Sequence, residues 1–219
     1  MTPLLIIGAG GHGSEVAAYA LDMGLPLLGA IDDGKLRGPW AGTALLGGLA
    51  DLSSICQEHS ELSYITAFGS NQIRRAIMQR IDAMKLGNLK PVSVLHNRSW
   101  HGANVEIGDG TLLAPHSLVT TRTRIGQHCI VNVKASVSHD CNIGDFCNIN
   151  PGATLCGEVE LGEGCYIGAG ATIIEKCKIG AWTIVGAGAV VTHDLPDGVT
   201  AVGVPARIIK RQGTTGNFS

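Results

Sequence analysis

A branched aliphatic residue stands at every sixth position over residues 105–191, and this period constrains the fold more than any other feature of the chain. The fifteen positions are Ile107, Leu113, Val119, Ile125, Val131, Val137, Ile143, Ile149, Leu155, Leu161, Ile167, Ile173, Ile179, Val185 and Val191. A period of six fits neither an α-helix nor an alternating strand, but it fits short strands joined by tight turns around a three-sided prism. The second half of the chain is therefore predicted to be a parallel β-helix.

An aliphatic–glycine pair recurs every eighteen residues in the same stretch, so three hexapeptides make one coil. The pairs begin at Ile107, Ile125, Ile143, Leu161 and Ile179. Residues n and n+18 are then expected to lie one above the other at about 4.8 Å, the spacing between neighbouring strands. Five of the seven cysteines share the small inward phase two residues before the aliphatics, and we interpret them as buried small hydrophobes.

The composition favours a protein that acts on small molecules. An apolar fraction of 45% over 219 residues supports the cores of two small domains, and a formal net charge of −2 provides no electrostatic footprint for nucleic acid. No apolar run reaches the roughly 20 residues of a membrane span, and the apolar start has no basic leader. We therefore expect a cytoplasmic protein without membrane insertion.

The first segments of the chain predict a nucleotide-binding domain. The apolar run Leu4–Ile7 leads into the glycine turn GAGGHG of residues 8–13, and apolar residues then follow at helical spacing. Such a turn presents backbone N–H groups and a helix N-terminus to a phosphate, which makes Gly10, Gly11 and His12 candidate contacts. His12 either donates to that phosphate or caps the helix.

Two later segments are expected to meet the same ligand, because the carboxyl ends of parallel strands share one edge of a sheet. An apolar run ends at Asp32 and Asp33, where such folds place a ribose-binding acid; a tight turn with exposed acids is the alternative. A strand over residues 64–68 leads through Ser70 and Asn71 into a helix. The residues predicted for the buried face of that helix are Ile73, Ile77, Ile81 and Met84.

The sixfold phase has not begun at residues 88–96, so the domain boundary is placed there. Residues 1–90 are predicted to form a Rossmann-like α/β domain, and residues 91–219 a β-helix with a C-terminal cap. The first domain has strands for only one mononucleotide half, which favours a nucleotide or nucleotide-sugar over NAD.

His139 and Asp140 are the candidate residues for acid–base chemistry on the predicted prism. A histidine is the natural base at neutral pH, and an adjoining carboxylate sets its tautomer and raises its basicity. The stacking rule places Gly157 directly above His139, where a glycine leaves room for a thioester and offers its N–H to the carbonyl oxygen. Together the three residues predict acyl-transfer chemistry.

Several segments resemble one family over nearly the whole chain: GAGGHG, Asp32-Asp33, GSNQIRR, SHDCNIGDFCNINPGA and GVPAR. The chain is similar to the bacterial nucleotide-aminosugar N-acetyltransferases of the bacillosamine and perosamine type, whose relatives include sialic acid O-acetyltransferases. This resemblance implies a left-handed β-helix and a homotrimer with sites in the clefts between prisms. It also implies acetyl transfer from acetyl-CoA to the amine of a nucleotide-linked 4-amino sugar, in bacterial surface glycan synthesis.

The resemblance assigns roles to single residues. His139 would be the general base, with Asp140 as its partner. The acetyl-CoA contacts would be Gly157, Ala169, Ala187 and Arg207, although the segment around Arg207 is alternatively only a cap. The acceptor-sugar contacts would be Asn132 and Asn148, the latter at a position where some members carry a second histidine.

Three other functions stay open at this point. One is O-acetylation of a sialic-acid-like sugar, and another is a non-enzymatic nucleotide-sugar-binding scaffold with an inert prism. The third is zinc catalysis, because His96 and His101 have a spacing similar to that of prism-shaped carbonic anhydrases. Neither His116 nor His128 is in stacking register with them, so no metal is expected.

Overall fold

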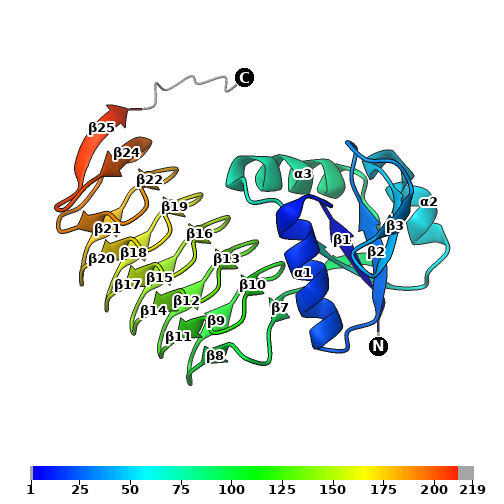
Figure 1. Cartoon of the computed structure of the whole chain (residues 1–219), viewed down its shortest axis with the longest axis horizontal. Helices are drawn as coiled ribbons and strands as arrows, with labels where there is room; N and C mark the ends of the chain where they lie inside the picture. Colours follow the sequence, from blue (N-terminus) through cyan, green and yellow to red (C-terminus); the bar gives the residue numbers. More distant parts are fainter. Residues whose placement is uncertain (1, 212–219) are drawn as a thin grey trace. The chain divides into compact units, whose positions relative to one another are not determined.

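A computed structural model describes residues 2–211 of the chain (Figure 1). They divide after His96 into two compact units. None of the helices in residues 2–211 is long and apolar enough to cross a membrane.

The first unit is built on a six-stranded sheet of order β3-β4-β2-β1-β5-β6. Its strands are β1 (Leu4–Ile7), β2 (Leu27–Ile31), β3 (Gly38–Trp40), β4 (Thr43–Gly47), β5 (Leu62–Thr66) and β6 (Leu89–Pro91). Its helices are α1 (Gly11–Asp22), a 3₁₀ turn (Leu49–Asp51), α2 (Leu52–Gln57) and α3 (Asn71–Ala83). The central strand β1 is wholly buried, as an apolar run flanked by parallel neighbours requires, and the predicted α/β architecture is confirmed.

A hairpin in this unit escapes the sequence analysis. Strands β3 and β4 pair antiparallel through a two-residue turn in which Ala41 and Gly42 both have positive φ, 45° and 79°. Two-residue hairpin turns need such angles and usually carry Asn-Gly or Asp-Gly. Because alanine occupies the first turn position, the sequence lacks the Asn-Gly or Asp-Gly pair that would have predicted the hairpin.

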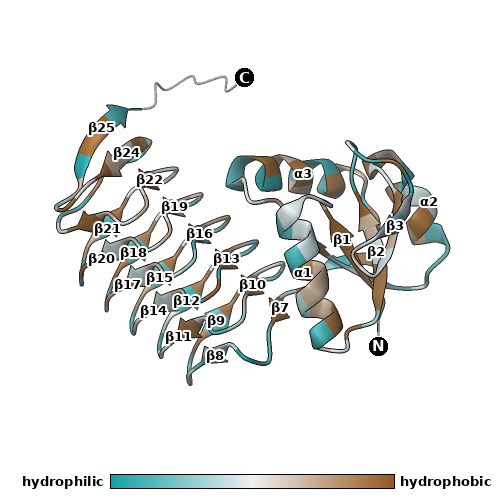
Figure 2. Cartoon of the chain, viewed as in Figure 1, coloured by the Kyte–Doolittle hydropathy of each residue, from teal (hydrophilic) through white to brown (hydrophobic). Residues whose placement is uncertain are grey.

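The face that α3 buries agrees with the prediction only in part: Ile81 is buried, and Ile77 and Met84 are half-buried. Its buried residues are Asn71, Arg74, Met78 and Ile81, whereas Ile73 is 51% exposed. The fully buried Arg74 donates from Nη1 to the Phe68 carbonyl oxygen at 2.8 Å, so the helix turns this side chain inward instead of Ile73. Figure 2 shows the resulting alternation of hydrophilic and hydrophobic residues along α3.

The second half of the chain is the predicted left-handed β-helix, made of three parallel sheets. One sheet holds β7 (Val94–Leu95), β10 (Leu112–Leu113), β13 (Ile130–Val131), β16 (Asn148–Ile149), β19 (Tyr166–Ile167), β22 (Ile184–Val185), β24 (Val199–Val202) and the antiparallel β25 (Arg207–Arg211). The second holds β8 (Trp100–His101), β11 (Leu118–Val119), β14 (Ser136–Val137), β17 (Thr154–Leu155), β20 (Thr172–Ile173) and β23 (Val190–Val191). The third holds β9 (Glu106–Ile107), β12 (Arg124–Ile125), β15 (Asn142–Ile143), β18 (Glu160–Leu161) and β21 (Lys178–Ile179).

The stacking rule of eighteen residues is confirmed by the strand register. Val119 pairs with Val137, and Val137 pairs with Leu155, each eighteen residues on. The sixfold aliphatics point inward and are buried, apart from Ile107 in the first coil, which is half-buried. The five inward cysteines are buried and free, and burial raises the pKa of the Cys141 thiol to about 11, so this thiol stays neutral at physiological pH.

Candidate active site on the prism

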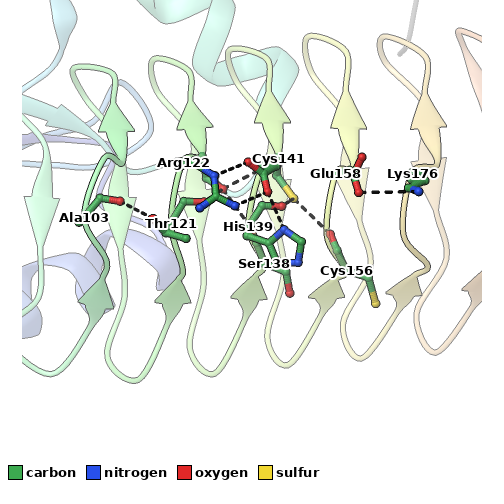
Figure 3. A network of polar contacts seen from close by, with 11 residues as sticks. Ala103, Thr121, Arg122, Ser138, His139, Cys141, Cys156, Glu158 and Lys176 are labelled. Carbon is green, nitrogen blue, oxygen red and sulfur yellow. Dashed lines mark hydrogen bonds and ion pairs between the residues drawn. The ribbon is translucent and has the colours of Figure 1, made fainter.

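The side chains around His139 come from one stack of turns, which joins the sheet of β11, β14 and β17 to the sheet of β12, β15 and β18 (Figure 3). Each of these turns holds one residue in the left-handed backbone region, and Arg122, Asp140 and Glu158 have φ of 51°, 60° and 60°. Because successive coils keep the eighteen-residue register, these three residues occupy equivalent places in adjacent turns. Chemistry on this edge is therefore assembled from consecutive coils.

The imidazole of His139 is held by its neighbour in the same turn. His139 Nδ1 lies 2.7 Å from Asp140 Oδ2. Because an ionised carboxylate only accepts, the neutral imidazole carries its proton on Nδ1 and keeps the lone pair of Nε2. The His139 side chain is 53% exposed, and its Nε2 has no partner within residues 2–211. The free nitrogen can therefore accept a proton from a bound ligand.

Arg122 holds the carboxylate from the preceding coil, a contact that the sequence analysis misses. Its Nε donates to Asp140 Oδ1 at 2.7 Å and its Nη2 to Oδ2 at 2.8 Å. Hydrogen bonds from Arg122 and then from His139 lower the pKa of Asp140 to about 2. Asp140 is therefore an anion at every pH at which the protein is expected to work.

Gly157 lies directly against the imidazole, as the stacking rule predicts. A Cβ added to Gly157 would sit 2.6 Å from Cε1 and 2.7 Å from Nε2 of His139. No positive φ is required at this position, so the glycine is needed for space and not for its backbone conformation. Within residues 2–211 the Gly157 N–H donates to no acceptor, which leaves it free to bind a ligand oxygen.

The other candidate residues of the prism lie on a different edge or on its C-terminal cap. Asn132 follows β13, Asn148 lies in β16, and Ala169 and Ala187 are exposed on the stacked turns that follow the same sheet. The register of those turns is shown by the Gly188 N–H, which donates to the Ala169 carbonyl oxygen at 2.9 Å. A single prism therefore does not bring these residues to His139.

The burial or the hydrogen bonds of three of these side chains bear on their expected roles. Asn148 is only 2% exposed, and Asn132 Oδ1 accepts the Val133 N–H at 2.7 Å. Arg207 begins β25 and is exposed, with Nη1 donating to the adjacent Ala206 carbonyl oxygen at 3.0 Å. Their roles as ligand contacts stay predictions.

The glycine turn of the first unit is fastened by Asp32. Asp32 Oδ2 accepts the Ala9 N–H at 2.7 Å, and Oδ1 accepts the Gly34 N–H at 2.9 Å. A Cβ at Gly13 would sit 2.1 Å from the Gly8 carbonyl oxygen, so the start of α1 packs on the turn as closely as only glycine permits. The conformation of the turn is thus held by hydrogen bonds and packing within the protein itself.

His12 is not the cap of α1, because Gly10 occupies the N-cap position. Its Nδ1 lies 3.1 Å from Glu15 Oε2, whereas Nε2 is buried without a partner in the described residues. Burial lowers the pKa of His12, so the imidazole is neutral at physiological pH. This buried nitrogen without a partner in the described residues is a candidate ligand contact.

A cavity of about 110 Å³ opens at the carboxyl ends of β1 and β2, where the sequence analysis places the nucleotide. It is lined by Ile7, Ile31, Asp32, Asp33, Leu49, Phe68 and Ile77. Asp33 Oδ1 accepts the Leu49 N–H at 2.6 Å, which leaves Oδ2 in an exposed contact with Arg80 at 3.4 Å. The apolar walls can pack against a ring such as a nucleotide base or a ribose, and the two carboxylates can accept hydrogen bonds from its polar groups.

The remaining candidates of this unit have structural partners. Ser70 is the N-cap of α3 as predicted, since its hydroxyl accepts the Ile73 N–H at 3.3 Å. Asn71 is 9% exposed, and its Oδ1 accepts the Gln72 N–H at 3.0 Å. His96, considered for zinc, is buried and its Nε2 lies 3.1 Å from Asp22 Oδ2. Within residues 2–211 no group of three His, Cys, Asp or Glu residues is arranged to hold a metal ion.

Comparison with known proteins yields matches in both halves of the chain. Residues 3–81 match the PglD N-terminal domain, and residues 158–193 match the bacterial transferase hexapeptide (six repeats). Perosamine N-acetyltransferase from Caulobacter crescentus, solved as a histidine mutant in complex with CoA and GDP-perosamine, is 31% identical, with a TM-score of 0.90 over 96% of this chain and 98% of that one.

A second solved structure is the acetyltransferase domain of PglB from Neisseria gonorrhoeae in complex with acetyl coenzyme A. It is 34% identical, with a TM-score of 0.86 over 94% of this chain and 98% of that chain. GDP-perosamine N-acetyltransferase from Escherichia coli O157:H7 is 36% identical over 75 residues, which are 34% of this chain. The chain spans only 24% and 33% of the lengths of the two curated relatives that it matches.

Proposed function

Because the chain belongs to the hexapeptide-repeat family of bacterial nucleotide-aminosugar N-acetyltransferases, we propose that it acetylates the amine of a nucleotide-linked 4-amino sugar with acetyl-CoA. The observation that carries this proposal is the imidazole of His139, which rests on Gly157 while Asp140 holds its Nδ1. Acyl transfer to an amine uses a base that takes the amine proton and a donor that binds the developing oxyanion. His139 Nε2 and the Gly157 N–H are these two groups.

In the proposed reaction the amine lone pair attacks the thioester carbon, and the carbonyl π electrons move to its oxygen. The Gly157 N–H donates to that oxygen and stabilises the negative charge. His139 Nε2 takes the proton that the new C–N bond makes acidic, and Asp140 stabilises the imidazolium. Collapse of the tetrahedral intermediate breaks the C–S bond, and the CoA sulfur leaves with the proton that His139 returns.

We assign the nucleotide to the first unit and acetyl-CoA to the prism. The support for the first assignment is the glycine turn, the buried and unpartnered Nε2 of His12, and the cavity beside Asp32 and Asp33. Such a turn supplies backbone N–H groups for a diphosphate, and the cavity is a fit for a base or ribose. The matched PglD N-terminal domain over residues 3–81 is consistent with this division.

We further propose a homotrimer, because the candidate residues occupy different parts of the prism. His139 and Gly157 lie on one edge, whereas Ala169 and Ala187 lie on another. A cleft between two copies can place the second edge of one prism against the first edge of the next, and this would enclose a long cofactor. Sedimentation should report a trimer, and a monomer with full activity would contradict this arrangement. Both proposed substrates are cytoplasmic metabolites, so we place the reaction in the cytoplasm.

The test is a thiol-release assay with acetyl-CoA across UDP-, dTDP- and GDP-linked 4-amino sugars and free sialic acid. We expect turnover with one nucleotide-linked amine and none with sialic acid. Preferred turnover of sialic acid would replace N-acetylation by O-acetylation. Binding of a nucleotide-sugar without turnover of any acceptor would favour a scaffold over an enzyme.

A further inference from the structure

Asp140 has a second partner that a simple histidine–carboxylate pair does not need. Arg122, eighteen residues earlier, reaches across one coil and forms two parallel hydrogen bonds to the carboxylate, of 2.7 and 2.8 Å. Asp140 Oδ2 therefore accepts from both Arg122 Nη2 and His139 Nδ1. A forked guanidinium–carboxylate contact fixes the plane of the carboxylate, which a single contact cannot do.

The same stack of turns contains a contrasting ion pair two coils further on. Lys176 and Glu158 occupy the equivalent turn positions there, but Lys176 Nζ and Glu158 Oε1 are 3.9 Å apart and form one loose, exposed contact (Figure 3). Exposed single contacts of this kind contribute little to stability. The forked pair therefore occurs at the level of the stack where His139 lies.

We propose that Arg122 is a positioning residue for the base: it fixes Asp140 in the plane that keeps the His139 ring over Gly157, and its charge limits the basicity of that ring. This inference rests on the proposed function. A rigid ring over Gly157 keeps Nε2 at the reacting atoms. The positive charge of Arg122 meanwhile opposes a second positive charge on the imidazole.

The charged groups of residues 2–211 that flank His139 decide the sign of the effect. Arg122 faces it from the preceding coil and Asp140 from its own turn, while Glu158 flanks Gly157 in the following coil and pairs with Lys176. The nearby Cys141 thiol is neutral, because burial raises its pKa to about 11. Removing the Arg122 charge should therefore make the imidazole easier to protonate.

The test compares Arg122→Gln with Lys176→Gln, which removes a cation from the same stack without touching the Asp140 pair. For Arg122→Gln we expect kcat to fall about 10-fold with both KM values nearly unchanged. The acidic limb of the kcat pH profile should move to higher pH, because the imidazole no longer faces a neighbouring positive charge. Lys176→Gln should leave kcat and the limb where they are in the unmodified protein.

Arg122→Lys separates the two parts of the proposal. A lysine keeps the charge but lacks the forked pair of donors, so the acidic limb should stay where it is in the unmodified protein while kcat still falls. A limb that moves as far in Arg122→Lys as in Arg122→Gln would overturn the role of the charge. Full activity in Arg122→Gln would overturn the positioning role.

A second readout does not depend on the reaction. The pH midpoint of the His139 Cε1–H proton signal, assigned by its loss in His139→Asn, should rise in Arg122→Gln and fall in Asp140→Asn. If no amino sugar is acetylated but these midpoints move apart, the proposed function fails and the Arg122 inference stands. If acetylation is found and the midpoints coincide, the inference fails alone.

Discussion

The two units of this protein differ in how their candidate residues are held. In the prism the turn residues around His139 have the same backbone conformation as the residues eighteen before and after them. Arg122, Asp140 and Glu158 have φ of 51°, 60° and 60°. In the α/β unit the carboxylate of Asp32 joins segments that are 23 residues apart, by accepting the Ala9 N–H. The prism therefore varies its side chains without changing its backbone, whereas in the α/β unit the same carboxylate shapes the turn and lines the cavity proposed for the nucleotide.

This difference makes mutations easier to interpret in the prism. A substitution on an exposed turn changes one side chain in a stack whose strands keep their hydrogen bonds, so an effect on turnover can be separated from an effect on folding. A substitution at Asp32 removes acceptors for two backbone N–H groups and alters the turn itself.

The largest expected effect is that of His139→Ala on turnover. If His139 is the base, kcat should fall by about 10²–10⁴-fold with KM values changed much less. The side chain is 53% exposed, so the thermal unfolding midpoint should stay close to that of the unmodified protein. Steady-state kinetics and calorimetry on the same preparation make the comparison, and near-normal turnover by the alanine variant would remove His139 from the mechanism.

The second effect is that of Gly157→Ala, which we expect to act through the imidazole. The new methyl group would sit 2.6 Å from His139 Cε1, and the exposed ring can move away from it. A displacement of about 1 Å costs on the order of 10²-fold in turnover, so kcat should fall by about 10- to 100-fold while the fold survives. Gly87→Ala is the matched control, because nothing lies within 4 Å of a Cβ there.

A double mutant decides whether the effect of Gly157→Ala passes through His139. On the His139→Ala background the added methyl group meets no imidazole, so Gly157→Ala should cause little further loss. Equal losses on both backgrounds would mean that the glycine contributes independently, for example as the donor to the thioester oxygen.

The third effect concerns the α/β unit and should combine binding with stability. Asp32→Ala is expected to raise the KM for the nucleotide-sugar about 10-fold, leave the KM for acetyl-CoA nearly unchanged, and lower the free energy of unfolding by about 1–3 kcal/mol. Asp33→Ala should raise the same KM at a smaller cost in stability, because its carboxylate accepts one backbone N–H, from Leu49. A rise in the KM for acetyl-CoA instead would mean that the two ligand sites are exchanged.

The prism could be predicted from the sequence almost residue by residue, because its period fixes both burial and stacking. Applying the eighteen-residue rule forward from His139 finds Gly157, and applying it backward from Asp140 would have found Arg122. The signal for Arg122 was therefore present, and what sequence alone does not show is that its side chain turns toward the carboxylate. The prediction that Asn132 and Asn148 contact the acceptor stays untested.

The α/β unit was less predictable because its contacts are not periodic. The spacing of Ile73 and Ile77 predicts a helix correctly, but the buried Arg74 and its bond to the Phe68 carbonyl set which face turns inward. The hairpin β3–β4 depends on positive φ at Ala41, which no composition rule anticipates. In both cases a tertiary contact or an uncommon backbone angle overrides the local pattern.

The smallest expected effect is that of Asp140→Asn on the pH dependence of stability. Arg122 and His139 lower the pKa of Asp140 to about 2, below the ordinary value of about 3.9. A group with a lowered pKa in the folded state contributes stability that is fully present above its unfolded pKa and is lost as the pH falls through the folded value. The unmodified protein should therefore lose its advantage over Asp140→Asn between about pH 4 and pH 2. Urea midpoints measured for both proteins at pH 6, 4 and 3 test this.

The difference should be small, because water screens a carboxylate whose side chain is 34% exposed. Glu158→Gln is the matched control: its carboxylate has one contact, at 3.9 Å, so its advantage should be smaller still. If the two variants show the same pH dependence, measured as the difference in stability from the unmodified protein, the forked pair adds no more to the folding of the prism than the loose Glu158–Lys176 contact does. Asp140 would then act only on the base, and the acidic limb of the kcat pH profile should still move down in Asp140→Asn because the imidazole has lost its anionic partner.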